Sequence, residues 1–147
     1  MIRPFHPTDQ EKLLHLLRLN TPQYFDPSEE ADFKDYLNQS SEHYFVVEEA
    51  GQLIGCGGYN FPDGPAIARI SWDIIHPDFQ GMGIGKQLTL HRINAIKNNP
   101  EVNEIIVRTS QLAFRFYEKL GFILEKTEKD YWAKGYDLYW MRMNLNV

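Results

Sequence analysis

A glycine-rich loop is the stretch of this sequence whose residue types are best suited to chemistry. It follows an apolar strand pattern and precedes a helix pattern. Its residues are Gln80, Gly81, Met82, Gly83, Ile84, Gly85 and Lys86. Glycines allow successive backbone N–H groups to turn toward one point, and the first turn of a helix adds unpaired N–H groups and the positive end of its dipole. The sequence therefore predicts an anion site here, and the natural anion is a phosphate or a pyrophosphate.

Two common phosphate loops do not fit these residues. A Walker A loop needs a glycine where Gln80 stands and a serine or threonine where Gln87 stands. The dinucleotide fingerprint Gly-x-Gly-x-x-Gly, counted from Gly81, needs its third glycine where Lys86 stands. These mismatches argue against both kinds of nucleotide-binding loop.

The loop instead resembles a signature of the GNAT N-acetyltransferase superfamily, Gln/Arg-x-x-Gly-x-Gly/Ala, through Gln80, Gly83 and Gly85. The second pattern of that family follows further along the chain, as Ala113-x-x-Phe116-Tyr117-Glu118-Lys119-Leu120-Gly121-Phe122. Two motifs in the right order are far more specific than either alone. The resemblance is strong from about Ile67 to Phe122 and rests on topology alone at the two ends.

This resemblance implies acetyl-coenzyme A as a co-substrate, gripped mostly by backbone N–H groups of the loop. The end of the preceding strand would bond the pantetheine arm and direct an N–H group at the thioester carbonyl. Ser110 stands where the family often has an asparagine, and serine can still donate and accept a hydrogen bond. The cofactor contacts that the resemblance implies are Ile74, Ile75, Gln80, Gly81, Met82, Gly83, Ile84, Gly85, Lys86, Ser110, Phe116 and Tyr117.

Acetyl transfer to an amine needs a base for the ammonium and an acid for the departing thiolate. Tyr117 matches the tyrosine that can protonate the thiolate in the family. A phenol with a pKa near 10 and a thiol with a pKa near 8.5 make that proton transfer reasonable. The competing interpretation is that Tyr117 only packs on the apolar face of its helix.

The base is less well defined by the sequence. Several family members carry a glutamate or histidine where this chain has Arg69, and arginine cannot act as a base. Asp73, which shares the predicted polar face of that strand, is the nearest carboxylate and the candidate catalytic base. The alternatives are Glu48, Glu49 and a relay through water.

Large rings in loops and at strand ends are candidates for the acceptor pocket. We expect Trp72 to pack in the core, because it alternates with apolar residues of its strand. The predicted substrate-binding residues are Tyr24, Phe25, Phe61, Arg69 and Trp132. With a formal net charge of −5, a small amine with an apolar portion is the expected acceptor, and a peptide amino terminus is the alternative. A different class of function stays open, namely a regulatory module that binds acyl-coenzyme A without turning it over.

The strands and helices that must position these residues indicate a mixed α/β fold. We expect residues 1–147 to form a single acetyltransferase domain. In the GNAT fold that the motifs imply, a mostly antiparallel sheet of six to seven strands contains a parallel, splayed central pair, and about four helices flank it. In the strand before the loop, alternation places Ala68, Ile70, Trp72 and Ile74 on one face and Arg69, Ser71 and Asp73 on the other. In the strand near Cys56, Gly55, Gly57 and Gly58 indicate a bulge or a close backbone approach.

Composition limits the partners, the cellular compartment and the metal content that we expect for this protein. The acidic net charge argues against a nucleic-acid partner, and no apolar run approaches the length of a membrane span. The single cysteine, Cys56, rules out an intramolecular disulfide and suits a reducing compartment, so the cytoplasm is expected. The five histidines are scattered without metal-ligand spacing, so no metal is expected. The chain would act as a monomer or homodimer.

Overall fold

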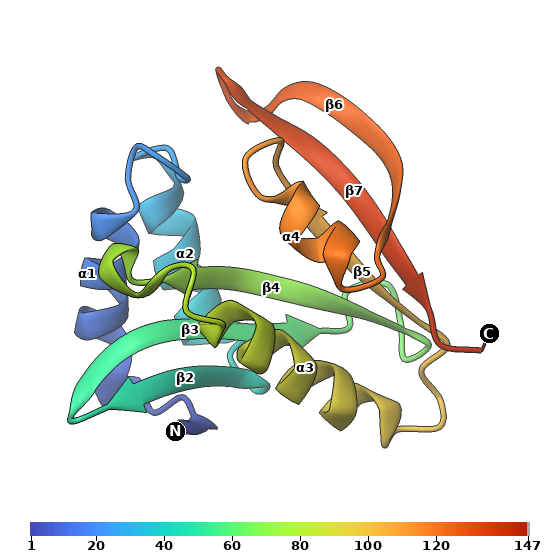
Figure 1. Cartoon of the computed structure of the whole chain (residues 1–147), viewed down its shortest axis with the longest axis horizontal. Coiled ribbons are helices and arrows are strands. Elements are labelled where there is room, and N and C mark those ends of the chain that lie inside the picture. Colours follow the sequence, from blue (N-terminus) through green and yellow to red (C-terminus); the bar gives the residue numbers. More distant parts are fainter. Residues whose placement is uncertain (147) are drawn as a thin grey trace. The chain divides into compact units, whose positions relative to one another are not determined.

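The computed structural model describes residues 1–146, which form two compact units. The first unit contains Met1–Asn60 and Ser71–Ile93, and the second contains Phe61–Ile70 and the residues from Asn94 onward. The strands follow the order β1-β2-β3-β4-β5-β7-β6 in one seven-stranded sheet (Figure 1). Four α-helices in the described residues accompany this sheet, so the predicted mixed α/β fold is confirmed.

The elements have the following bounds. The helices are α1 Gln10–Leu19, α2 Glu29–Gln39, α3 Ile84–Lys97 and α4 Phe114–Lys119, with short 3₁₀ turns at Pro7–Asp9 and Pro77–Phe79. The strands are β1 Ile2–Pro4, β2 Tyr44–Glu49, β3 Gln52–Asn60, β4 Ile67–Ile75, β5 Glu104–Thr109, β6 Ile123–Ala133 and β7 Tyr136–Asn144.

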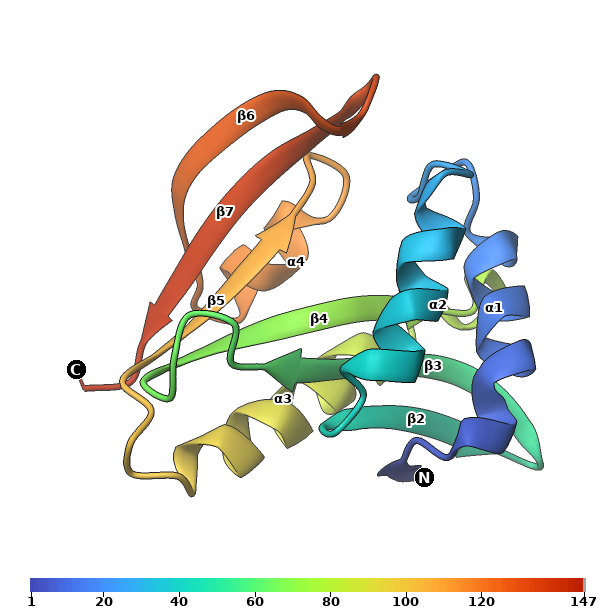
Figure 2. The same cartoon turned by 180° about the vertical axis from the view of Figure 1, so that it is seen from behind.

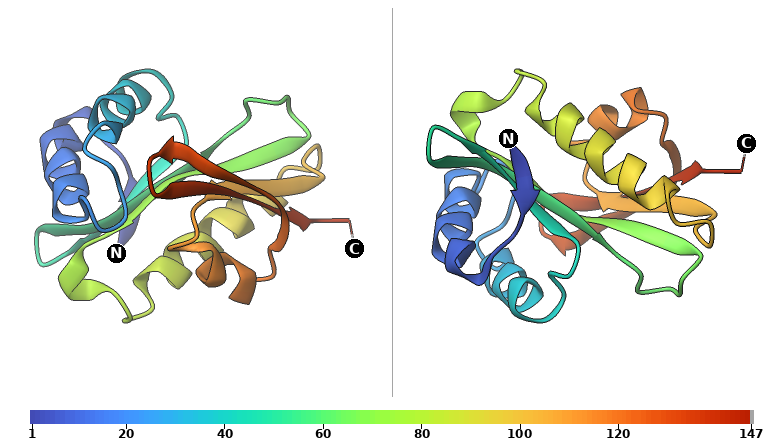
Figure 3. Two further views of the ribbon diagram at one scale, coloured as in Figure 1. Left: turned by 90° about the horizontal axis from the view of Figure 1, so that it is seen from above. Right: turned by 90° about the horizontal axis from the view of Figure 1, so that it is seen from below.

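The first unit is a three-layer sandwich, with strands in the middle and helices on both faces. Helices α1 and α2 lie over one face, where Leu13, Phe33 and Val46 belong to one buried cluster (Figure 2). The start of α3 lies over the other face, where Leu88 packs with Ile54 (Figure 3). Alternation along β2 and β3 explains this division, because neighbouring side chains of a strand point to opposite faces.

Strand β4 departs from the predicted alternation at Trp72. This residue has a φ of +49°, which is in the left-handed region and costs a non-glycine residue about 1–2 kcal/mol. The prediction that its ring packs in the core is confirmed, since it contacts Phe33 at 4.9 Å between ring centroids. Ser71 was predicted on the opposite face from Trp72, which is wrong. Ser71 is buried and donates to Asn60, whose amide donates to Ser40 at the end of α2.

The glycines of β3 mark a close backbone approach, one of the two predicted alternatives. A Cβ on Gly57 would lie 2.8 Å from Nη1 of Arg92 and would also collide with the Asp73 carboxylate. A Cβ on Gly58 would lie 2.6 Å from Cδ1 of Tyr44. Both positions therefore need a residue without a side chain, because neighbouring groups already occupy that space.

The second unit is built on β5, β7 and β6. The part of β4 from Ile67 to Ile70 pairs in parallel with Glu104 to Val107 of β5, as predicted for a strand, helix, strand sequence. Strands β5, β7 and β6 pair antiparallel. Helix α4 contacts β7 through Phe114 and Tyr139, whose ring centroids are 4.7 Å apart.

Candidate functional site

The glycine-rich loop is an exposed turn that leads directly into the start of α3. Gly81 and Gly83 have φ values of +79° and +84°, in the region that favours glycine. The first backbone hydrogen bond at the start of α3 is donated by the N–H group of Gln87 to the carbonyl of Gly83, at 3.0 Å. Within the described residues, the N–H groups of residues 82–86 make no hydrogen bond. Loop and helix start thus offer consecutive free donors, which fits the predicted anion site.

The first residue of this loop is anchored by its side chain. Nε2 of Gln80 donates to Oδ1 of Asn20 at 3.1 Å and to the carbonyl of Ile75 at 3.2 Å. Asn20 is itself buried at the end of α1 and donates to the carbonyl of Leu16 at 3.0 Å. Gln80 therefore fixes the loop to the ends of α1 and β4, a role that the family signature alone did not reveal.

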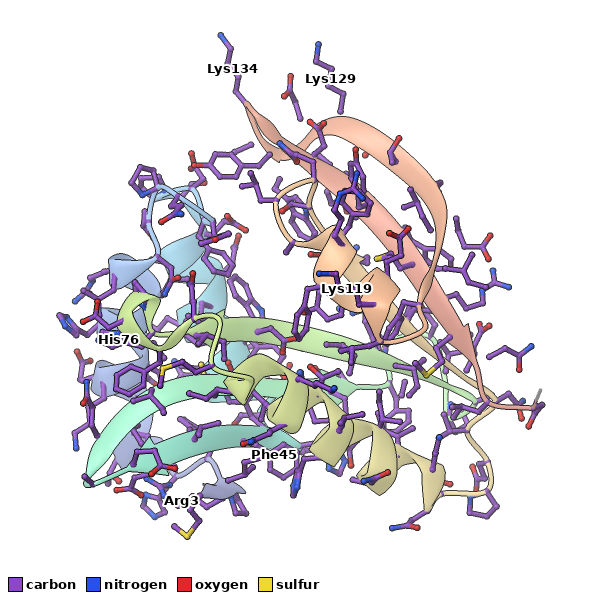
Figure 4. The ribbon with its side chains drawn as sticks, in the orientation of Figure 1. Arg3, Phe45, His76, Lys119, Lys129 and Lys134 are labelled. Carbon is purple, nitrogen blue, oxygen red and sulfur yellow. The ribbon has the colours of Figure 1, made fainter. Side chains whose placement is uncertain are left out.

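The end of β4 leads directly into this loop. Ile74 is buried in the cluster under α1 and α2, and Ile75 is half-buried on the strand's last position. His76 follows directly after the strand (Figure 4). Its N–H group donates to the carbonyl of Ile54 at 2.8 Å. Backbone groups of Ile74 and Ile75 therefore lie at a strand end that leads into the loop.

The candidate base Asp73 forms an ion pair with Arg92 of α3. The Asp73 side chain is 18% exposed, and the Arg92 side chain is fully buried. The guanidinium also donates to the carbonyl of Gly58 at 3.1 Å, to Oγ1 of Thr89 at 3.1 Å and to the carbonyl of Leu88 at 3.3 Å. The carboxylate on β4 is therefore held inside the first unit by a buried cation.

The two alternative carboxylates on β2 also have charged partners. Oε1 of Glu48 accepts from Nε of Arg3 at 2.8 Å, and Arg3 binds Asp9 as well. Oε1 of Glu49 lies 3.0 Å from the amino group of Met1. Each protein carboxylate that the sequence offered as a base is thus engaged in an ion pair.

Cys56 is buried between the sheet and α1 and α2. Burial raises the pKa of its thiol to about 12. A thiol with that pKa remains protonated at neutral pH, and only the thiolate is a good nucleophile. The residue therefore behaves as a small apolar side chain.

Tyr117 lies on α4 in the second unit and is only 4% exposed. Its ring makes edge contacts with Phe116, at 5.1 Å between centroids, and with Phe122, at 5.8 Å. Phe116 is more exposed than Tyr117. These contacts fix the orientation of the Tyr117 ring within its unit.

Ser110 begins the turn between β5 and α4. Its Oγ accepts from the N–H group of Leu112 at 3.2 Å, and its carbonyl accepts from Ala113 and Phe114. Gln111 then binds the tip of the β6–β7 hairpin twice: Nε2 donates to the carbonyl of Gly135 at 2.7 Å, and Oε1 accepts from the N–H group of Asp137 at 2.9 Å. This turn and the hairpin tip therefore form one hydrogen-bonded assembly.

The predicted acceptor-binding residues are divided between the units. Tyr24 and Phe25 lie in the first unit, in the turn between α1 and α2, and Phe25 stacks on Trp72 at 6.1 Å between centroids. Phe61, Arg69 and Trp132 lie in the second unit.

Trp132 is fixed at the base of the β6–β7 tip. Its Nε1 donates to the carbonyl of Thr109 at 3.1 Å. The guanidinium of Arg108 lies 5.5 Å from its ring centroid and 6.0 Å from that of Tyr131. Beyond these rings, Lys129 and Lys134 point away from the tip (Figure 4).

Sequence reasoning missed Arg92 and Gln111. Arg92 interrupts an otherwise apolar stripe of α3, between Leu88 and Ile96, and a charged residue at a core-facing helix position is a usable signal. Gln111 carried no such signal, because a glutamine in a turn is common and its partners lie far along the chain.

Two absences concern only the part of the chain that the structure describes. No group of three or more histidine, cysteine, aspartate or glutamate side chains there is arranged to hold a metal ion. No helix within residues 1–146 is both long enough and apolar enough to cross a membrane.

Comparison with known proteins identifies relatives that are described as acetyltransferases. A family profile described as "Acetyltransferase (GNAT) domain" matches residues 9–145. An N-alpha-acetyltransferase of Sulfurisphaera tokodaii is 28% identical over 95% of this chain and 90% of its own length.

Two solved structures share the fold. The ribosomal-protein-S18-alanine N-acetyltransferase of Escherichia coli superposes with a TM-score of 0.81 at 20% identity, over 99% of this chain and 93% of that one. An aminoglycoside 6'-N-acetyltransferase complexed with coenzyme A gives a TM-score of 0.79 at 16% identity, over 98% and 96% of the two chains.

Proposed function

This chain belongs to the GNAT family of acetyltransferases and is an N-acetyltransferase, and we propose that it transfers the acetyl group of acetyl-coenzyme A directly to a primary amine in a ternary complex. Acetyl-coenzyme A, when bound, supplies the activated acetyl thioester. The observation that carries the proposal is the row of free N–H groups at residues 82–86, in the sequence pattern of the family. Direct transfer is supported by Cys56, because its buried thiol stays protonated at neutral pH and is therefore a poor nucleophile for the acetyl group.

The grip on the cofactor is assigned to the loop and its neighbours. The free N–H groups of residues 82–86 and the positive end of the α3 dipole suit a pyrophosphate. Lys86, which is exposed, adds a positive charge. The carried-over contacts with the rest of the cofactor are Ile74, Ile75, Ser110 and Phe116.

Tyr117 is assigned the role of general acid for the departing thiolate. Its position in the second family motif supports this role, and its two ring contacts hold the phenol in one orientation. A fixed donor is more effective than a mobile one, because its orientation need not be found during the reaction.

For the base we favour a relay through water. Asp73, Glu48 and Glu49 all lie in ion pairs, so none offers an unengaged carboxylate. Asp73 remains the second candidate, because part of its side chain is exposed. Asp73→Asn separates the two: loss of a basic group from the pH profile of kcat supports Asp73, and an unchanged profile supports water.

The acceptor is proposed to be the α-amino group of a peptide or protein, with small amines that carry an apolar portion as the second candidate. The first choice is supported by the N-alpha-acetyltransferase that aligns with 95% of this chain. The second is supported by the half-buried rings of Tyr24, Phe25 and Trp132. A panel of peptides with different first residues, tested beside small aromatic and aliphatic amines, decides between them.

The deciding experiment measures release of free coenzyme A thiol with that panel. Amine-dependent release is the expected result. Tight binding of acetyl-coenzyme A without release for any acceptor would instead support the alternative function, a regulatory module that holds the cofactor.

A further inference from the structure

We propose that Arg92 is a positioning residue for acetyl transfer, holding the bent Trp72–Asp73 segment of β4 in place against α3. The inference rests on the proposed function, in which the backbone at the end of β4 directs an N–H group at the thioester carbonyl. It assigns to Arg92 a role that neither family motif contains.

The bend itself needs restraint from both faces of the sheet. Trp72 has a left-handed backbone, which a non-glycine residue keeps only when its surroundings enforce it. From the α2 side, the hydroxyl of Tyr44 donates to the carbonyl of Trp72 at 2.7 Å. From the α3 side, Arg92 binds the Asp73 carboxylate.

Arg92 is well built for this purpose. Its guanidinium is fully buried and has four acceptors, on β4, on β3 and on its own helix. The planar fork directs several bonds at once, whereas a lysine ammonium would act as a single point charge. Gly57 leaves room for the pair, since a Cβ there would collide with both charged groups.

The same helix begins at the glycine loop. Residues 84–86 supply part of the free N–H row, and Arg92 follows on the same rigid element. Through Arg92, the helix that binds the anion is therefore fixed to the strand segment whose backbone would orient the acetyl group. This connection lies entirely within the first unit. In this arrangement the Asp73 side chain, through its ion pair with Arg92, holds the backbone of its own strand segment in place.

The experiment compares Arg92→Lys with wild type and with Arg18→Met as a matched control. Arg18 is an exposed arginine of the same unit, bound to Glu30. Three quantities are measured: kcat with the best acceptor, acetyl-coenzyme A affinity by calorimetry, and hydrogen exchange of the amides of residues 72–74. For Arg92→Lys we expect kcat to fall at least tenfold, affinity to change less than threefold, and exchange to accelerate at least tenfold. Arg18→Met should match wild type in all three.

A milder variant covers the case in which Arg92→Lys does not fold. Tyr44→Phe releases the bend from its other face while keeping the ring, and it should lower kcat and exchange protection in the same direction. Unchanged exchange at residues 72–74, or an unchanged kcat in a folded Arg92→Lys protein with lowered thermal stability, would overturn the positioning role. If wild type releases no thiol with any acceptor, the proposed function fails, and the exchange measurement still decides whether Arg92 holds the bend.

Discussion

At the scale of single residues, Gly83 offers the most direct test of the anion site. Its left-handed φ means that Gly83→Val strains the backbone by about 1–2 kcal/mol, and the side chain would protrude from the loop where a ligand approaches. Gly51 is a matched control, because it also has a positive φ and open space around it. We expect similar losses of thermal stability in Gly83→Val and Gly51→Val. Only Gly83→Val should lose acetyl-coenzyme A binding in calorimetry, and equal binding by both would contradict the assignment.

Tyr117→Phe tests the general acid while keeping the ring that packs between Phe116 and Phe122. General acid catalysis typically contributes ~10²–10⁴-fold, so kcat should fall by that order. Cofactor affinity should not change, and thermal stability should change little. Tyr139→Phe, which also removes a hydroxyl from the second unit, should retain activity. A fall in kcat of less than about threefold, worth only ~0.65 kcal/mol of barrier, would mean that the thiolate takes its proton elsewhere.

At the scale of elements, Gln111 joins the β5–α4 turn to the β6–β7 tip. Gln111→Ala removes two hydrogen bonds, each with a net worth of about 0.5–1.5 kcal/mol. Hydrogen exchange at the amide of Asp137, which loses its acceptor, should accelerate roughly tenfold, because ~1.4 kcal/mol corresponds to that factor. The Michaelis constant for the acceptor should rise without a change in that for acetyl-coenzyme A. Gln39→Ala, at the exposed end of α2, is the control.

An unchanged Asp137 exchange rate in Gln111→Ala would mean that the tip is held by its other bonds. These are the ones that Asp130 receives from Gly135 at 2.7 Å and donates to Asp137 at 2.9 Å. An altered acetyl-coenzyme A constant would instead show that the turn, rather than the tip, is the affected element.

The elements were more predictable than the contacts between them. A period of two identified the strand that precedes the glycine loop, and the glycines in β3 correctly indicated a close backbone approach. Alternation failed at Ser71 and Trp72, because a bend held by Tyr44 and Arg92 overrides local pattern. Such restraints join residues far apart in sequence, and a single sequence does not show which distant side chains meet.

The candidate site was predictable where backbone groups, rather than side chains, would bind the ligand. Gly83 and Gly85 identify a loop with free amides without any knowledge of partners. Asp73 shows the opposite case: its residue type suggested a base, but its carboxylate is paired with a cation nineteen positions away on another element. The interaction of a side chain with a distant partner is the part that sequence patterns leave open.

At the scale of the whole molecule, buried neutral acids predict loss of stability at alkaline pH. Burial raises the pKa of Cys56 from 9.0 to about 12 and that of Tyr36 from 10.0 to about 12. The unfolded chain therefore releases these protons at lower pH than the folded chain. The stability that depends on the neutral forms is complete below about pH 9 and is lost as pH rises toward 12.

Urea unfolding between pH 8 and 11 measures this loss. The thiol alone should contribute a slope of about −1.4 kcal/mol per pH unit above pH 9. Cys56→Ala lowers the starting stability by removing a buried atom, but it should also reduce the steepness by that amount. An equally steep decline in Cys56→Ala would assign the effect to other groups, with Tyr36→Phe as the next variant.

Strand β6 lies at the end of the strand order, and residues 123–131 of it are exposed. The unpaired backbone groups of an open sheet edge of this length can pair with strands of other copies, which leads to aggregation. Here the pairing of β6 with β7 is irregular in two places, and Asp130 has a left-handed backbone. The strand also carries many charges, namely Glu125, Lys126, Glu128, Lys129 and Asp130. Irregular backbone and charge together make this edge a poor template, so we expect that the sheet does not extend from one copy to the next in concentrated solution.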